Sequence, residues 1–458
     1  MPSNGLLSRR SFFAAAQIHM QILSEICCHW AAVDFDAPWK ATLVCHLWRA
    51  AVLSSPKAWS IVNVCFPPAY EKKPPKQKNL PWGTDSGSED DCIEEDSDAP
   101  PKPRPWALWL ARARGSDLVV RIFCGICPRV DLIYSAIRLL SSHAGKIKVL
   151  EVDSNSVVMT MAQVFSMFDC ATLALKSLSL SINLRPFQRL LKMREDSGVV
   201  DGFWNFLTKS PHLRSLTLSG CVLGSEGASF RGRQNQLGLK TLIMENPHRF
   251  RLHPVLETIR PFICLEILIL DISVVDRDTN SPTLILPTLK TFVGHDEHIL
   301  GSLTLPKLEN LTFHTESSTD DLVTVLAELF ERGTNLQNLT LAHALLSNSS
   351  SRRIFQHIPS LTALELQYSA IALQSLVATA PSDRLLCPRL QTLRLISSLS
   401  SDGANLLDII KARRKSASAR PITTLVLSEC KLLSSHEVDK MRNAGGSGLI
   451  VKYTEYDT

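Results

Sequence analysis

A short leucine-rich signature recurs through residues 106–458 and constrains the fold of this chain more than any other feature. It consists of an apolar residue, two variable residues, a leucine, one variable residue and a second apolar residue, as in LQNLTL (Leu336–Leu341). Eleven copies, the first one weak, have a mean spacing of about 27.5 residues. The copies begin at Ile147, Leu175, Leu213, Leu239, Leu265, Leu289, Leu308, Leu336, Leu361, Leu390 and Ile422. Such a period predicts an array of stacked repeats.

The spacing lies within the window of roughly 20–29 residues that is typical of leucine-rich repeats. We expect the leucines at the first, fourth and sixth places to point inward, and the third, fifth and seventh places to point outward, because side chains alternate along a strand. One repeat cannot bury its apolar face, but stacked neighbours form a continuous core. The sequence therefore predicts an α/β fold over 106–458, a leucine-rich-repeat solenoid with a concave parallel sheet and convex helices.

Further elements are predicted around the signatures. Strands are expected at 118–123 and 449–453, and helices at 203–207 and 320–331, where apolar residues recur at helical spacing. Ser434 and Glu437 form a capping box, and Gly445 is suited to end the helix that they begin. In five repeats a proline stands two residues before the first leucine, where it ends the preceding helix and keeps the chain extended. These prolines are Pro211, Pro287, Pro306, Pro359 and Pro388.

Residues 17–64 have a different pattern and predict an all-α module of short helices. One apolar stripe begins at Ile18 and a second at Leu43, each at helical spacing, and four tryptophans lie in this short segment. The segment is too small to build a large core of its own. It is therefore either a helical cap on the repeats or a docking module whose apolar surface belongs to a partner.

Residues 65–105 are predicted to be a disordered linker. They hold nine of the chain's 25 prolines, and residues 85–98 carry eight acidic and no basic residues. The apolar content is too low to offset the entropy of ordering. Ser86 and Ser88 are candidate phosphorylation sites within this acidic tract, although tracts of this kind are usually only solvated linkers.

Composition limits the cellular locations and the kinds of partner that we expect for this protein. The net charge is +5, and it rises to +13 without residues 85–98, but the bases are scattered over the chain. No apolar run reaches the roughly 18 residues that a membrane helix needs. The 12 cysteines lack framework spacing, and Cys45, Cys170 and Cys264 lie in apolar patterns, which predicts reduced, buried thiols. We therefore expect a cytoplasmic or nuclear protein, although residues 8–13 superficially look like an export signal.

The blocks within residues 17–64 resemble an F-box. Ile18–Ile26 (IHMQILSEI) resembles the Leu-Pro-x-Glu-Ile-Leu-x-x-Ile opening of that family, Val44–Arg49 (VCHLWR) its Val-Cys-x-x-Trp-Arg core, and Ser55–Trp59 (SPKAW) its Pro-x-Leu-Trp close. The spacing between the blocks is also similar. The repeats in turn resemble the leucine-rich repeats that often follow an F-box in fungal proteins.

The resemblance implies a docking surface for a Skp-type linker subunit. Carried over residue by residue, that surface comprises Ile18, Ile22, Leu23, Ile26, Leu43, Val44, Cys45, Trp48, Pro56 and Trp59. Alternatively, about half of these side chains only close the helices on one another. The chain departs from the family pattern at Gln21 and Ala58, and the opening proline is missing, which reduces the expected contact surface.

A search for catalytic or metal-binding residues finds little. Cys124 and Cys127 form a lone CxxC without a partner pair, and His295 and His298 lack further ligands at zinc spacing. No nucleophile elbow, HExxH or dinucleotide-binding glycine pattern occurs. The basic run at 411–415 is either a nuclear address or, more simply, a solvated helix face. We expect neither enzymatic activity nor a cofactor or metal.

The repeat register predicts two groups of neighbours on the concave face. The seventh places of consecutive repeats are Asp271, His295 and His314, and parallel strands lie about 4.8 Å apart, so these side chains should form a row. An acid beside histidine raises its proton affinity, which would make the row a pH-sensitive recognition patch, unless it is an incidental hydrated row. The fifth-place residues Glu365 and Arg394 should also be cross-strand neighbours.

Together these features predict a substrate-recognition adaptor of a Skp–cullin–F-box type ubiquitin ligase in ubiquitin-dependent protein degradation. The helices would dock on the linker subunit, and through it on a cullin. The concave sheet would hold a client protein through residues such as Asp271, His295, His314, Glu365 and Arg394. The alternative is an interaction scaffold whose F-box has decayed. We expect neither nucleic acid nor a membrane as partner, and the sequence does not identify the client.

Overall fold

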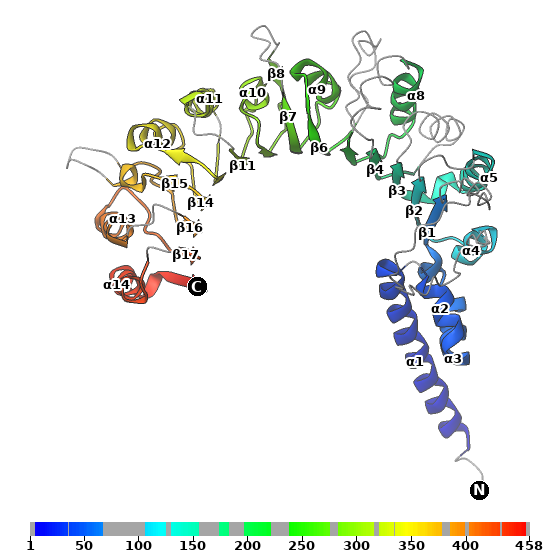
Figure 1. Cartoon of the computed structure of the whole chain (residues 1–458). Helices are drawn as coiled ribbons and strands as arrows, with labels where there is room; N and C mark the ends of the chain where they lie inside the picture. Colours follow the sequence, from blue (N-terminus) through cyan, green and yellow to red (C-terminus); the bar gives the residue numbers. More distant parts are fainter. Residues whose placement is uncertain are drawn as a thin grey trace, which may run out of the picture. The chain divides into compact units, whose positions relative to one another are not determined.

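The computed structural model describes thirteen segments of the chain: 5–34, 36–66, 106–124, 130–154, 174–182, 197–220, 238–274, 283–315, 320–333, 335–377, 385–398, 403–430 and 433–454. The chain divides into two compact units (Figure 1). Unit 1 comprises 1–175 and 182–210, and unit 2 comprises 176–181 and 211–458. Beyond Phe66, the linker predicted at 65–105 lies outside the described residues, so its disorder and the phosphorylation of Ser86 and Ser88 stay predictions.

Unit 1 begins with the helices predicted from residues 17–64. These are α1 (Gly5–Val33), α2 (Ala37–Val44), α3 (His46–Ser54) and the 3-10 helix η1 (Pro56–Trp59). Pro38 lies in the first turn of α2, where its missing N–H removes no helical hydrogen bond. Cys45 is extended, with φ of −161°, and separates α2 from α3.

Three parallel strands follow in unit 1: β1 (Ile61–Phe66), β2 (Leu118–Cys124) and β3 (Ile147–Ser154), in the order β1-β2-β3. The helices α4 (Trp106–Ala113), α5 (Val130–Ser141), η2 (Ala144–Lys146) and α8 (Ser197–Thr208) complete the described part of the unit. Strand β1 is absent from the sequence prediction, which placed residues 61–64 at the end of a helical module. Its run IVNVCF is rich in β-branched residues and pairs with β2, so tertiary pairing decides its conformation.

Unit 2 is built on a parallel sheet that contains every repeat signature from Leu175 onward. Its strand order is β4-β5-β6-β7-β9-β11-β12-β14-β16-β17-β18. The strands are β4 (Ser177–Ile182), β5 (Ser215–Ser219), β6 (Thr241–Phe250), β7 (Ile267–Val274), β9 (Thr291–Gly294), β11 (Asn310–His314), β12 (Asn338–Ala342), β14 (Ala363–Gln367), β16 (Thr392–Ile396), β17 (Thr424–Ser428) and β18 (Ile450–Thr454). The predicted strand positions are therefore confirmed.

Helices cover one face of this sheet (Figure 1). They are α9 (Leu252–Ile259), α10 (Glu297–Gly301), α11 (Asp320–Glu331), α12 (Asn348–Phe355), η4 (Leu373–Leu376), α13 (Gly403–Lys415), α14 (Ser435–Gly445) and η5 (Gly446–Gly448). Two short strand pairs, β8 (Leu284–Ile285) with β10 (Leu303–Thr304) and β13 (Leu345–Leu346) with β15 (Ala370–Ile371), lie in the connections. The predicted helix at 320–331 and the capping box of α14 are confirmed. The left-handed residue that ends α14 is Gly446, with φ of 69°, rather than Gly445.

The core of unit 2 lies between the sheet and its helices. Leu336, Leu339 and Leu341 fill the first, fourth and sixth places of one signature and are at most 1% exposed. Leu339 pairs in register with the fourth-place residues of both neighbouring strands, so leucines stack into a continuous ladder. Full burial of each such side chain contributes roughly 1.5–3 kcal/mol. The fold is a leucine-rich-repeat solenoid.

A series of backbone hydrogen bonds joins consecutive repeats just beyond the carboxyl ends of several strands. Gly220, His343, Tyr368, Ser397 and Glu429 each follow a strand in the left-handed conformation, with φ between 48° and 74°. The N–H of each donates to a carbonyl of the next repeat at 2.8–3.2 Å. Four of these five residues are not glycine, which costs free energy at each position. The rings of His343 and Tyr368 stack 5.1 Å apart, and this series of hydrogen bonds therefore fixes where His343 lies.

Candidate functional site

Helices α1–α3 expose a group of large apolar side chains. Ile22 and Ile26 of α1 are 52% and 44% exposed, Leu43 and Val44 of α2 are 78% and 57% exposed, and Leu47 of α3 is 49% exposed. We call these five residues the helical apolar face. Exposed apolar patches typically mark interaction sites on soluble proteins, so these helices carry a candidate interaction site.

Small side chains hold these helices together. Cys27 and Ala31 of α1, Ala37 and Ala41 of α2, and Ala51 and Val52 of α3 are all buried. Because small side chains allow close helix packing, some larger residues of the same helices, such as Leu43, remain on the surface.

All of the helical apolar face except Leu47 was predicted to dock, and the remaining members of the predicted docking set have varied environments. Cys45 is exposed, whereas Leu23, Trp48 and Pro56 are partly buried. The Trp48 ring packs edge-on against Trp30 at 6.3 Å. The side chain of Ile18 lies outside the described residues. The docking role of the whole set stays a prediction.

Trp59 is fully buried and has no exposed surface to offer a partner. Its Nε1 donates to the Val52 carbonyl at 2.8 Å, and its ring lies edge-on to Trp39 and Trp109, both at 5.2 Å. Trp109 lies 50 residues further along the chain, in α4, and donates its Nε1 proton to the Trp59 carbonyl at 2.6 Å. The Arg112 guanidinium sits 4.7 Å and 4.5 Å from the Trp39 and Trp59 rings. For Trp59, closure of the module is therefore the better interpretation.

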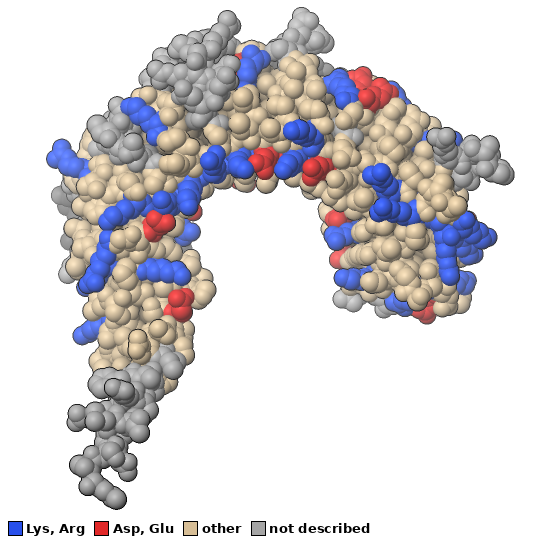
Figure 2. Space-filling view, turned by 180° about the vertical axis from the view of Figure 1, so that it is seen from behind, with Lys and Arg blue, Asp and Glu red and all other residues tan. Residues whose placement is uncertain are grey.

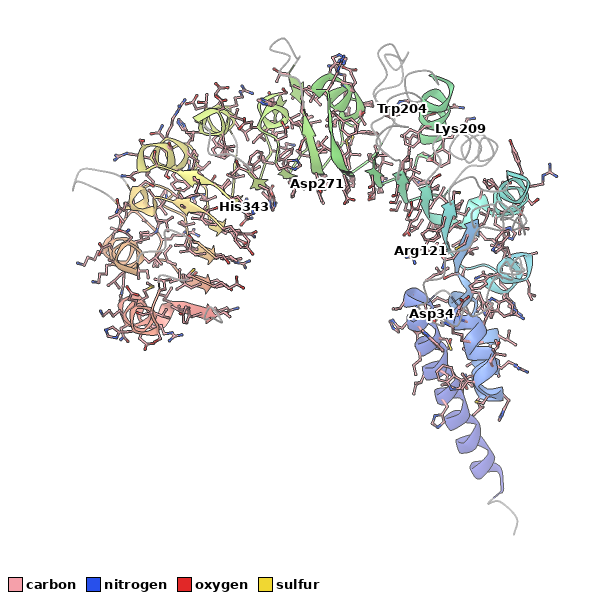
Figure 3. All side chains as sticks on the ribbon, in the orientation of Figure 1. Asp34, Arg121, Trp204, Lys209, Asp271 and His343 are labelled. Atoms are coloured by element: carbon pink, nitrogen blue, oxygen red, sulfur yellow. The ribbon has the colours of Figure 1, made fainter. Side chains whose placement is uncertain are left out.

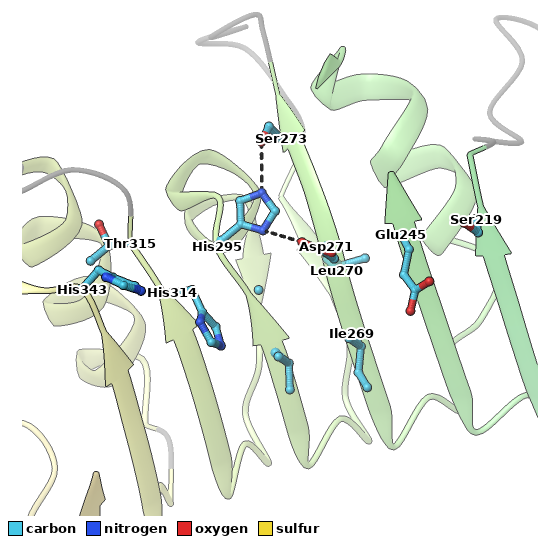
Figure 4. A pocket seen from close by; sticks show the side chains of 12 residues that line it. Ser219, Glu245, Ile269, Leu270, Asp271, Ser273, His295, His314, Thr315 and His343 are labelled. Atoms are coloured by element: carbon cyan, nitrogen blue, oxygen red, sulfur yellow. Dashed lines mark hydrogen bonds and ion pairs between the residues drawn. The ribbon is translucent and has the colours of Figure 1, made fainter. Parts of the chain in front are cut away.

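Unit 2 carries a groove of about 1090 Å³ at the carboxyl ends of its strands (Figure 4). Asp271 and His343 lie beside it on the side of the sheet away from the helices (Figure 3). The lining residues are Ser219, Glu245, Ile269, Leu270, Asp271, Ser273, Val293, Gly294, His295, His314, Thr315 and His343. The predicted row of Asp271, His295 and His314 is thus brought together in one groove.

His295 is the centre of the polar contacts in this groove. Its Nδ1 lies 3.4 Å from Oδ1 of Asp271, and its Nε2 lies 3.0 Å from the hydroxyl of Ser273 (Figure 4). The predicted neighbours Asp271 and His295 are therefore in contact. Asp271 is paired in register with Glu245 of β6, which the sequence analysis missed although it occupies the same seventh place. His343 was also missed, because Ala342 occupies the seventh place of that repeat.

The predicted rise in histidine proton affinity is wrong for His314. Burial lowers the pKa of His314 first, and the nearby imidazoles of His343 and His295 lower it further. Asp271 acts in the opposite direction but has the smallest influence. The imidazole of His314 therefore stays uncharged at neutral pH.

Glu365 and Arg394 are cross-strand neighbours, as predicted. They are paired in register between β14 and β16, and their side chains form an ion pair at 3.4 Å. Gln367 donates to the Glu365 carboxylate at 2.6 Å. Glu365 is therefore already engaged within the sheet, and the proposed contact of this pair with a client stays a prediction.

Several minor predictions are corrected. In the basic run at 411–415, Lys411, Arg414 and Lys415 are exposed as a solvated face predicts, whereas Arg413 is fully buried and donates to backbone carbonyls, including that of Cys387 at 2.6 Å. Cys45 and Cys264 are exposed rather than buried. Cys45 lies between α2 and α3, and Cys264 lies in the turn that follows α9, so neither is on a buried helix face. Cys170, and Cys127 of the CxxC, lie outside the described residues. Within the described segments, no three His, Cys, Asp or Glu residues are grouped as metal ligands.

Comparison with known proteins supplies similarities at the level of fold. No family model matches the chain, and no curated protein matches it. Among solved structures, the leucine-rich-repeat protein LegL7 from Legionella pneumophila is similar at 15% identity, with 62% of this chain and 95% of that chain covered and a TM-score of 0.33. Rad7, in its complex with Elc1 from yeast, is similar at 14% identity, with 73% and 74% covered and a TM-score of 0.31. A protein from Bacteroides fragilis is similar at 13% identity, with 54% and 79% covered and a TM-score of 0.27.

The structure also bears on membrane association. In the part of the chain that it describes, no helix combines the length and the apolar character that are needed to cross a membrane.

Proposed function

We propose that this protein is a substrate-recognition adaptor, with the helical apolar face docking on a Skp-type linker subunit and the sheet of unit 2 holding a client protein. The exposure of Ile22, Ile26, Leu43, Val44 and Leu47 carries this proposal. Ile22 and Ile26 occupy apolar positions of the F-box-like opening, and Val44 occupies one in the F-box-like core. All five side chains are exposed on unit 1.

The mechanism is positioning. An adaptor raises the effective concentration of its client near a ubiquitin-loaded subunit, and the bond is then formed elsewhere in the assembly. The protein itself would catalyse no reaction and would need no cofactor. A cullin would be reached only through the linker subunit.

Co-purification with a Skp-type linker subunit tests the proposal. Leu43→Asp and Val44→Asp each place a charge on the helical apolar face at a position that is more than half exposed, so the fold should persist while capture is lost. Leu108→Asp is the matched control, because Leu108 is also an exposed leucine (42%) but lies in α4, outside the predicted docking set. Wild type and the control should capture the subunit.

The alternative function is an interaction scaffold that binds a partner without ubiquitin transfer. It predicts that neither wild type nor any variant captures the linker subunit, while binding of a client by unit 2 persists. That result would overturn the adaptor proposal.

A further inference from the structure

The groove of unit 2 contains two carboxylates that the protein itself leaves largely unused. Glu245 is exposed, and no hydrogen bond or ion pair joins its carboxylate to another described residue. The Asp271 side chain is 77% exposed, and within the described segments only His295 contacts its carboxylate. Glu245 and Asp271 are paired in register on adjacent strands, so their side chains start about 5 Å apart. Together they can face one ligand.

In the described part of the sheet, the outward-facing third and fifth places around this pair carry no charged side chain. The third and fifth places of strands β4 to β12 are occupied only by serine, threonine, asparagine, isoleucine and valine. These residues are Ser177, Ser179, Ser215, Thr217, Thr241, Ile243, Ile267, Ile269, Thr291, Val293, Asn310, Thr312, Asn338 and Thr340. Among the third, fifth and seventh places of these strands, Glu245 and Asp271 are the acidic side chains, and no lysine or arginine stands at those places.

The floor of the groove is apolar beside these carboxylates. Ile269 and Val293 line it. Ile269 lies on the strand that leads to Asp271 (Figure 4), and Val293 lies on β9, which His295 follows. A ligand that matches both features has an aliphatic part and a cationic end. Lysine and arginine side chains have this composition, with a methylene stem that packs on apolar surface and a charged head.

We propose that this groove binds a lysine or arginine side chain of a client protein, with its stem on Ile269 and Val293 and its head between Glu245 and Asp271. That the side chain belongs to a client protein rests on the proposed function. That the ligand is cationic with an aliphatic stem rests only on the residues of the groove. A nucleic acid is disfavoured here, because its phosphates would meet the two carboxylates.

The amino-terminal ends of the same strands provide a contrast. There Lys240 and Lys290 flank Glu266, whose carboxylate lies 2.6 Å and 3.9 Å from their amino groups. Figure 2 shows, on the face turned to the viewer, basic side chains gathered in a row with acidic ones among them. Glu266 is thus paired with two lysines within the protein, whereas in the described segments no lysine or arginine pairs with Glu245 or Asp271.

Fluorescence anisotropy with the full chain tests the proposal. The probe is a labelled Gly/Ser peptide with a Leu-Arg-Leu-Arg centre, and its matched control has Leu-Glu-Leu-Glu instead. We expect the arginine peptide to bind and the glutamate peptide not to bind. The double variant Glu245→Gln/Asp271→Asn should weaken arginine-peptide binding by about tenfold, since each exposed charge pair contributes a factor of up to about five.

Glu309→Gln is the matched control variant. It removes one carboxylate from the amino-terminal end of β11, and it should change the affinity by less than about twofold. The proposal is overturned if the glutamate peptide binds as tightly as the arginine peptide, if neither peptide binds at millimolar concentration, or if the double variant binds like wild type.

A pH titration provides a second readout. The titratable groups facing the bound cation are Glu245, Asp271, His295, His314 and His343. Protonation of His314 as the pH falls through its lowered pKa adds positive charge beside the cation, so binding should weaken as the solution is made acidic and should weaken less in His314→Gln. Tighter binding at low pH would contradict the proposal. Capture of the linker subunit by the double variant is measured in parallel, so that failure of the groove and failure of the adaptor function are distinguished.

Discussion

Helices α1–α3 and the repeats of unit 2 use apolar side chains in opposite ways. In the repeats, large leucines are buried: Leu336, Leu339 and Leu341 are at most 1% exposed. In α1–α3 the buried positions hold mainly small residues, and Leu43 is 78% exposed. Leucines of one region therefore contribute to folding, whereas those of the other are available for binding.

The tryptophans of unit 1 compensate for this loss of buried area. Trp39, Trp59 and Trp109 form an edge-to-face cluster with centroid distances between 5.2 and 6.0 Å. Such pairs each contribute about 0.5–1.5 kcal/mol beyond burial. The cluster joins η1 to α4, so a region with few large buried aliphatic residues is stabilised by buried indole rings.

Removal of this cluster should have the largest effect. Trp59→Ala deletes a fully buried ring together with its hydrogen bond to Val52, and we expect a loss of about 3–5 kcal/mol in the free energy of unfolding. Chemical denaturation monitored by tryptophan fluorescence and circular dichroism measures this change. A loss below about 1 kcal/mol would mean that the cluster does not stabilise unit 1.

The leucine ladder should show the next largest effect. Leu339→Ala opens a cavity in the middle of unit 2, and we expect a loss of about 3 kcal/mol. Thr340→Ala is the control on the same strand, because its side chain lies on the open face of the sheet and should cost much less. Thermal denaturation of both variants checks the difference. Equal losses would show that the ladder is not the main stabilising element.

The capping box of α14 should have a smaller, pH-dependent effect. Ser434→Ala removes the side-chain acceptor of the Glu437 N–H, which should cost about 1 kcal/mol. Hydrogen bonds from the Ser434 backbone and hydroxyl lower the pKa of Glu437. Because the folded state holds this pKa below its unfolded value, the stabilisation is present above the unfolded pKa and is lost as the pH falls through the folded pKa.

Denaturation at several pH values between about 6 and 3 measures this dependence. Wild type should lose stability relative to Glu437→Gln as the pH falls, because glutamine does not titrate. The same pH dependence in both proteins would assign it to other carboxylates.

How far the sequence predicts the structure depends on repetition. The strands of unit 2 are predictable because the leucine signature recurs in each repeat. The cross-strand pair Glu365–Arg394 follows from the register of that signature. Strand β1 occurs once and carries no signature, so only its pairing with β2 reveals it. His343 lines the groove because its backbone is left-handed, with φ of 59°. No residue pattern in the sequence predicts this conformation.

The candidate docking site shows a similar limit. The resemblance to an F-box selects apolar residues, but it does not separate exposed Leu43 from buried Trp59. That separation depends on Trp109, which lies 50 residues beyond Trp59 on the far side of the linker segment. Contacts over such a distance carry no local sequence signal.

The smallest expected effect sharpens the comparison between the two regions. Leu43→Ala removes a leucine that is mostly exposed, so the free energy of unfolding should change by no more than about 0.5 kcal/mol, against about 3 kcal/mol for Leu339→Ala. The same substitution should weaken capture of the linker subunit, because an exposed leucine contributes its burial only when a partner covers it. Parallel denaturation and capture assays on the two variants measure both quantities. If Leu43→Ala destabilises the protein as much as Leu339→Ala does, the residue belongs to the core of unit 1 and the helical apolar face loses its most exposed member.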